Sequence, residues 1–144
     1  MSSNVRLNPS LYGAIALAAA LGGVLRYSVS IAWVEWGSGG WPWPTLIVNV
    51  LGSFLIAVYW RLAGPDARFQ ASLERRTVVM TGFCGGLTTF SMFGVETLVL
   101  LEQARWAGAA GYVVLSGIGA LGAAWLGLQD FRHGPPRAMK LRRS

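Results

Sequence analysis

The stretch TGFCGGLTTFS, residues 81–91, places glycines and hydroxyl groups inside a strongly apolar segment. A helix in a bilayer normally hydrogen-bonds all its own backbone N–H and C=O groups. A break at membrane depth frees some of these groups, and it is tolerated only where protein, water or an ion bonds them instead. We expect the helix over residues 77–101 to be interrupted over residues 82–89. This pattern favours an ion site or pore inside a bilayer over a plain membrane anchor.

Four long apolar runs organise the 144 residues of the chain, at residues 11–31, 44–60, 78–100 and 107–128. Arg26 and Glu96 are the charged residues that fall within them. Each run is close to the roughly 20 residues that a membrane-spanning helix needs. We therefore predict an all-α membrane protein with helices over residues 11–31, 44–62, 77–101 and 106–128. The four helices form one transmembrane channel domain, residues 11–128. An amino-terminal tail, residues 1–10, precedes it, and a basic tail, residues 129–144, follows it.

The first apolar run can also be compared with a secretory signal, with Arg6 as its charged region and residues 18–20 as a cleavage site. The run continues past these alanines to Ile31, which is longer than a signal core. We therefore favour a membrane span at this position.

The net charge of +6 is explained by arginines that flank membrane spans rather than by nucleic-acid binding. With four spans, both tails and the middle loop lie on one side, and that side holds most of the basic residues, so the positive-inside rule places both termini in the cytoplasm. Cys84 is the single cysteine, which excludes an intrachain disulfide. No phosphate loop, Cys/His metal spacing or Ser/His/Asp set is present, so we expect no enzyme.

Small residues recur on the faces of two predicted helices. Ala14, Ala18 and Gly22 are four residues apart in the first, and several glycines share one side of the last: Gly108, Gly111, Gly119 and Gly122. Such stripes let helices approach closely in lipid. Because four helices enclose little volume, tight packing and a dimer are expected. Tryptophans 33, 36, 41 and 43 mark one membrane interface.

The second predicted helix carries a small polar face. Asn49 lies deep within it, with Thr45 one turn before and Gly52 and Ser53 one turn after. The amide of Asn49 could donate a hydrogen bond to an anion, or it could join two helices, as intramembrane Asn often does. The sequence leaves both interpretations open.

The third predicted helix places Phe90, Phe93, Glu96 and Thr97 on one face. Aromatic rings have a positive edge, so ring edges could line an anion path, although two such residues are usually packing. Glu96 is an intramembrane acid and thus a functional candidate. It could couple to protons, bind a cation, hydrogen-bond to Tyr112 and Ser116, or reach the interface near the helix end.

Arg26 lies near the end of the first predicted helix. It could extend to the headgroups or attract anions at a pore mouth. Neither interpretation is decided by the sequence.

Three segments together resemble the signature of the Fluc (CrcB) fluoride channels. They are GGVLRY at residues 22–27, WPTLIVNVLGSF at residues 43–54 and TGFCGGLTTFSMF at residues 81–93. The likeness covers residues 11–128. It implies a passive, fluoride-selective channel of the bacterial inner (plasma) membrane that relieves fluoride toxicity, built as an antiparallel, dual-topology dimer with two pores.

The resemblance also implies roles for individual residues. Asn49 would be the pore amide, Phe90 and Phe93 the ring-edge ligands, and Arg26 the arginine that ends the first helix. Hydroxyls and polar groups would continue the fluoride path: Ser91, Thr45, Glu96, Tyr112 and Ser116. Backbone carbonyls of Gly85 and Thr88 would hold a structural Na⁺ at the dimer centre.

Some positions depart from the family pattern. Met92 stands where Thr is usual, Gly94 where Ser is common, and Ala120 and Ala124 where hydroxyls could continue the polar path. The charge bias between the two sides fits a chain that pairs with an oppositely oriented paralogue. A homodimer is nevertheless the expected partner arrangement, with membrane lipids around it.

Two other functions are compatible with four spans. A small multidrug-type proton-coupled transporter would need an acid in the middle of the first helix, where none occurs. A non-transporting membrane adaptor would act through its basic tail on anionic lipid or nucleic acid.

Overall fold

The computed structural model describes residues 8–36, 40–65, 67 and 69–129. Their elements are α1 (Pro9–Trp36), α2 (Trp43–Ala63), α3 (Leu73–Thr77), η1 (Val78–Cys84), α4 (Gly85–Leu87), α5 (Phe90–Glu102) and α6 (Trp106–Leu128). The segment η1 is a π-helix. No strand occurs among these described residues, which confirms the predicted all-α class.

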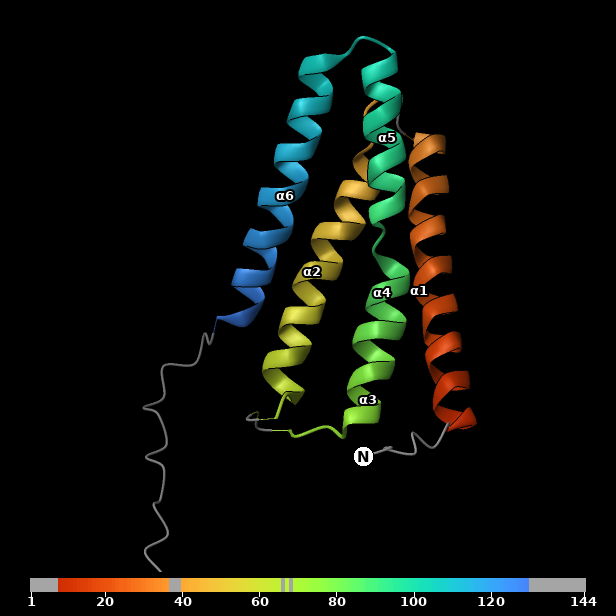
Figure 1. Ribbon diagram of the computed structural model, residues 1–144, viewed down its shortest axis with the longest axis vertical. Coiled ribbons are helices and arrows are strands. Elements are labelled where there is room, and N and C mark those ends of the chain that lie inside the picture. The colour runs from red at the N-terminus through yellow and green to blue at the C-terminus, as the bar shows by residue number, and fades with distance from the viewer. Residues whose placement is uncertain (1–7, 37–39, 66, 68, 130–144) are drawn as a thin grey trace, which may run out of the picture.

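Four of the helical stretches are long and apolar enough to cross a membrane: Pro9–Val34, Trp43–Ala63, Leu73–Glu102 and Trp106–Leu128. The third comprises α3, η1, α4 and α5, with a break between α4 and α5. The four spans run alternately up and down, so that α1 begins and α6 ends at the same end of the bundle (Figure 1). Arg61, Arg75 and Arg76 therefore lie at one end, and Arg105 at the other.

Two helix pairs supply most of the packing within the chain. Helix α6 packs along α2, and α1 packs along η1 and α4. The second pair depends on missing side chains, because a methyl group at Gly22 would overlap the carbonyl oxygen of Phe83 and one at Gly86 would overlap that of Ala19. Gly82 is similarly close to Ala18, whose Cβ would lie 2.9 Å from an added methyl. The small residues of α1 thus pack against two glycines of the broken span, Gly82 and Gly86.

The prediction that the third span is interrupted over residues 82–89 is wrong in its extent. Gly82 lies within the helical segment η1, and Gly85 and Gly86 begin α4. The helical path is lost at Thr88 and Thr89. Gly82 and Gly86 serve the close approach of α1 rather than the break itself.

The boundaries of the first span and of the amino-terminal tail also differ from those predicted. Helix α1 starts at Pro9 and continues to Trp36, so the amino-terminal tail is shorter than residues 1–10. Ser28 and Ser30 donate side-chain hydrogen bonds to the carbonyls of Val24 and Arg26, and the helix continues through them. Of the basic tail, residues 130–144 lie outside the described residues.

We predict that Gly22→Ala will weaken the contact between α1 and α4, because the added methyl must push two backbones apart. Overpacking of this kind costs about 1–3 kcal/mol, measurable as reversible unfolding of the purified protein in mixed micelles. Gly13→Ala is the matched control on the same helix, since a methyl there meets nothing within 4 Å. Equal unfolding free energies for the two variants would contradict the packing role.

Candidate ion-conducting site

The break in the third span consists of two extended residues. Thr88 has φ −85° and ψ 157°, and Thr89 has φ −150° and ψ 121°. The Thr88 amide still donates to the carbonyl of Cys84 at 3.0 Å, and the Thr88 hydroxyl donates to the same oxygen at 2.9 Å. Regular helical bonding therefore ends at Thr88, and groups beyond it need other partners.

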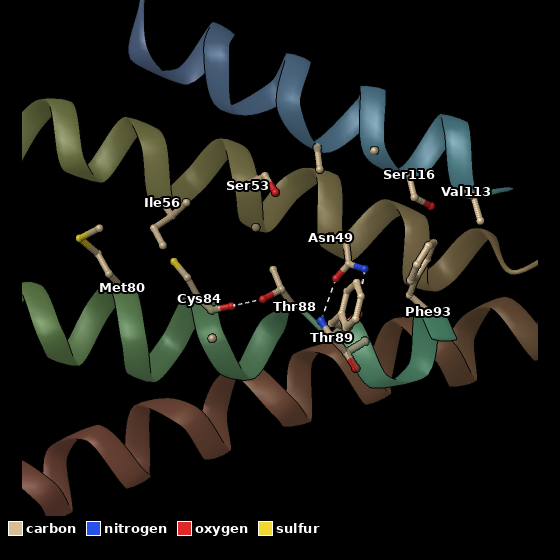
Figure 2. A pocket seen from close by; sticks show the side chains of 15 residues that line it. Asn49, Ser53, Ile56, Met80, Cys84, Thr88, Thr89, Phe93, Val113 and Ser116 are labelled. Atoms are coloured by element: carbon tan, nitrogen blue, oxygen red, sulfur yellow. Dashed lines mark hydrogen bonds between the residues drawn. The ribbon is translucent and has the colours of Figure 1, made fainter. Parts of the chain in front are cut away.

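Asn49 supplies two of those partners. Its Oδ1 accepts from the Thr89 amide at 2.8 Å, and its Nδ2 donates to the Thr89 carbonyl at 3.0 Å (Figure 2). The Thr89 hydroxyl in turn accepts from the amide of Met92 at 3.2 Å and so caps α5. The interpretation of Asn49 as a joint between two helices is confirmed.

The same geometry leaves Asn49 with donor capacity. A side-chain amide carries two N–H groups, and the bond to Thr89 uses one of them. Asn49 also lines a cavity of about 560 Å³. Donation of the second N–H to an anion therefore stays a prediction that the geometry permits.

Arg26 contacts the other side of the break. Its Nε donates to the carbonyl of Gly86 at 3.4 Å, in the last turn before Thr88. A helix C-terminus carries partial negative charge, and arginine is favourable there. Because α1 continues to Trp36, Arg26 is not at the helix end. Whether it also extends to the headgroups or attracts anions at a pore mouth stays a prediction.

A cavity of about 560 Å³ lies beside the break, between α2, the broken span and α6 (Figure 2). Its lining combines a few polar groups with apolar and small residues: Asn49, Gly52, Ser53, Ile56, Met80, Cys84, Gly85, Thr88, Thr89, Phe90, Phe93, Val113, Ser116, Gly117 and Ala120. This composition suits a site that orients a small solute with a few placed donors.

Ser116 gives the cavity a second available donor. Its side chain is 9% exposed, and its Oγ has no hydrogen-bond partner among the described residues. The expected bond between Glu96 and Ser116 is thus not formed. A buried hydroxyl without a partner is costly, so Ser116 is suited to a bound ion or water.

Thr45, Glu96 and Tyr112 form a separate, partly buried cluster that we call the carboxyl cluster. The Thr45 hydroxyl donates to Glu96 Oε1 at 2.8 Å, and the Tyr112 hydroxyl donates to Glu96 Oε2 at 2.6 Å. Tyr112 is fully buried, and Thr45 is 4% exposed. The expected bond from Glu96 to Tyr112 is confirmed. Both oxygens of the Glu96 carboxyl group have a hydroxyl partner within the bundle.

Phe93 connects the cavity with the carboxyl cluster. Its ring centroid lies 5.6 Å from that of Phe90 and 5.2 Å from that of Tyr112. Phe93 is partly buried, whereas Phe90 is 84% exposed on the single chain. The two predicted ring ligands are thus adjacent, and both line the cavity.

The remaining predicted site residues lie at or near the break. Ser91 is exposed, and its hydroxyl is 3.2 Å from that of Thr89, but it does not line the cavity. Gly85 and Thr88 do line it. Among the described residues, no backbone hydrogen bond joins α4 to α5, so the carbonyls of Gly85 and Thr88 fit a role as cation ligands.

Side-chain cation ligands do not gather here, since no three His, Cys, Asp or Glu residues cluster within the described part of the chain. A cation at the break would accordingly depend on carbonyl oxygens. Oxygen donors of this type suit hard cations.

Two residues that contribute to the site were not predicted from the sequence. Thr89 was not selected, although a hydroxyl three residues before Met92 is a possible helix cap. Trp41 was assigned to the interface, yet its ring packs against Tyr112.

The chain resembles proteins of one family along most of its length. Residues 13–128 match the family described as CrcB-like protein, Camphor Resistance (CrcB). A protein of Rhodopseudomonas palustris named fluoride-specific ion channel FluC 1 is 44% identical over 123 residues, which cover 85% of this chain and 87% of that protein.

Two further relatives carry the name fluoride-specific ion channel FluC. The protein of Opitutus terrae is 45% identical over 118 residues, covering 82% of this chain and 89% of its own length. The protein of Paramagnetospirillum magneticum is 43% identical over 116 residues, which cover 81% of this chain and 91% of that protein. The chain belongs to the CrcB family of membrane proteins.

Proposed function

We propose that this protein is a passive, fluoride-selective ion channel that lets fluoride leave the cytoplasm across the inner membrane of a bacterium, and so relieves fluoride toxicity. The observation that carries the proposal is the cavity beside the helix break, which is lined by Asn49, Ser116 and the rings of Phe90 and Phe93. The names of the relatives, fluoride-specific ion channels at 43–45% identity, support the same function.

Fluoride is small and strongly hydrated, so a pore must replace its lost water with donors. The second N–H of Asn49 and the unpartnered hydroxyl of Ser116 supply two such donors. The rim of Phe93 adds weak positive potential beside them. Ions can still depart because the lining of the cavity holds no fixed lysine or arginine.

The carboxyl cluster extends this path beyond Phe93. In our proposal, fluoride moves from the cavity past the ring of Phe93 toward the hydroxyls of Thr45 and Tyr112. Both hydroxyls donate to Glu96, so they can exchange one acceptor for another as an anion passes. Ser91 stands at the start of α5 as a further hydroxyl near the entrance.

The functional unit in this proposal is an antiparallel dimer. Methyl groups added at Gly111, Gly117 and Gly122 of α6 would meet nothing within the chain, which leaves this part of α6 open for a neighbour. The exposed ring of Phe90 is explained in the same way, since a second subunit would cover it. We favour a homodimer, with an oppositely oriented paralogue as the alternative partner.

A structural Na⁺ completes the proposed dimer. The carbonyls of Gly85 and Thr88 from both subunits would hold it at the dimer centre, where a fixed positive charge makes the site more favourable for anions. The break leaves these carbonyls without a hydrogen bond to α5, which supports the proposal that they are Na⁺ ligands.

The multidrug-transporter alternative is disfavoured by the position of the intramembrane acid. Such a transporter would use an exchangeable acid in the middle of its first helix, and the middle of α1 has none. Glu96 lies on α5 and is engaged by two hydroxyls. The adaptor alternative depends on the tail beyond residue 129, outside the described residues.

We predict rapid fluoride efflux from liposomes that contain the purified protein, with chloride almost excluded and no need for a proton gradient. Ion-selective electrodes measure both halides in the same vesicle preparation. Protein-free vesicles are the control. Retention of fluoride equal to that control would rule out the proposed function.

We predict that Phe93→Ile slows fluoride efflux by on the order of tenfold, because the aliphatic side chain fills space but has no positive ring edge. Phe54→Ile is the matched control, since Phe54 lies on α2 and does not line the cavity. The same liposome assay measures both. Undiminished flux through the Phe93 variant would remove this ring from the ion path.

We predict that Asn49→Asp lowers fluoride efflux by roughly 10- to 100-fold, as expected for the loss of a hydrogen bond to an ion. The carboxylate can still accept from the Thr89 amide but offers no N–H to an anion. Size-exclusion chromatography in detergent checks that the assembly is retained. An assembled variant with normal flux would show that Asn49 acts on the broken helix alone.

A further inference from the structure

We propose that Trp41 is a positioning residue for the ion path, which sets the orientation of Tyr112 and, through it, of the carboxyl cluster. This inference rests on the proposed channel function for its flux readout. Tryptophan near a membrane surface usually anchors a protein at the headgroups. The contacts of Trp41 indicate a different role.

The segment that carries Trp41 is fixed to the rest of the bundle on both sides. Arg105 donates to the carbonyl of Gly40, and the carbonyl of Trp41 accepts from the amide of Trp43 at 2.8 Å. Arg105 is itself held by a tight turn, in which its amide donates to the carbonyl of Leu100 at 2.9 Å. The backbone of Trp41 therefore has a defined position relative to α5 and α6.

The side chain of Trp41 lies against Tyr112. The two ring centroids are 5.5 Å apart, and the ring planes meet at 75°, an edge-to-face arrangement. The ring of Phe93 lies 5.2 Å from the same tyrosine. Tyr112 is fully buried in a cluster with Leu100 and Ala109, and Trp41 and Phe93 pack against that cluster.

The orientation of the Tyr112 ring determines where its hydroxyl points. That hydroxyl donates to Glu96 Oε2 at 2.6 Å, while Thr45 occupies Oε1. A smaller residue at position 41 would leave space beside the ring, into which Tyr112 could rotate. Glu96 would then lose one of its two donors, and the ring of Phe93 would lose a fixed neighbour.

Trp43 provides a matched comparison. Its ring centroid is 4.6 Å from that of Trp41, but the side chain is 41% exposed, and no ring contact with Tyr112 is formed. Trp43 thus has the contacts expected of an interface anchor. If Trp41 were also only an anchor, loss of either indole would have the same effect.

The test compares Trp41→Leu, Trp41→Phe, Trp43→Leu, Tyr112→Phe and the double variant Trp41→Leu/Tyr112→Phe in the fluoride and chloride efflux assay. We expect Trp41→Leu to slow fluoride about tenfold, to lower the fluoride preference over chloride, and to be partly rescued by Trp41→Phe. Trp43→Leu should remain near the parent protein. The double variant should be no slower than Tyr112→Phe, because one residue acts through the other.

Additive losses in the double variant, or equal losses from Trp41→Leu and Trp43→Leu, would overturn the proposal. A second readout does not depend on conduction. In reversible micelle unfolding, the stability losses of Trp41→Leu and Tyr112→Phe should be non-additive, and strict additivity would overturn the positioning contact. A parent protein without fluoride efflux would reject the proposed function, while the unfolding cycle would still decide the contact between Trp41 and Tyr112.

Discussion

The structure depends on hydrogen bonds to the backbone groups that the interrupted third span leaves free in an apolar environment. At Thr88 and Thr89 the third span leaves the helical path. Asn49 from α2 bonds both backbone groups of Thr89, and Arg26 from α1 bonds the carbonyl of Gly86. Three of the four spans are therefore coupled at one level of the bundle. Unpaired groups at this depth would cost several kcal/mol each, so the site is fixed before any ion enters.

Glycines of α1, α2 and the broken span allow close packing around this level. Gly22, Gly82 and Gly86 let α1 and the broken span approach until backbone meets backbone. This close approach is what brings Arg26 within reach of the Gly86 carbonyl. Gly52 has the same function on α2, where an added methyl would overlap the Thr88 side chain. The break and the packing beside it are therefore parts of one arrangement.

The sequence predicts the four spans well because long uncharged runs have few alternatives in a chain of this size. It also identifies Asn49 and Glu96, since polar side chains are conspicuous in apolar helices. It cannot locate the break, because a glycine suits both an interruption and a close contact, and only the position of α1 decides between them. Thr89 was missed for a related reason: its partner Asn49 is 40 residues away in the chain. The end of α1 was placed too early, because the predicted helix stopped with the apolar run at Ile31, whereas α1 continues to Trp36.

Two hydroxyls on the proposed ion path share one property that bears on conduction. The hydroxyls of Thr45 and Tyr112 are both committed to Glu96. A donor that already has a protein partner gains less from an ion than a free donor would, because it exchanges one bond for another. Conduction needs sites that attract an ion without retaining it. In the proposed channel, the polar groups that make the fold rigid thus also limit how tightly fluoride is held, and Ser116, whose hydroxyl has no partner among the described residues, is where we expect an ion to stay longest.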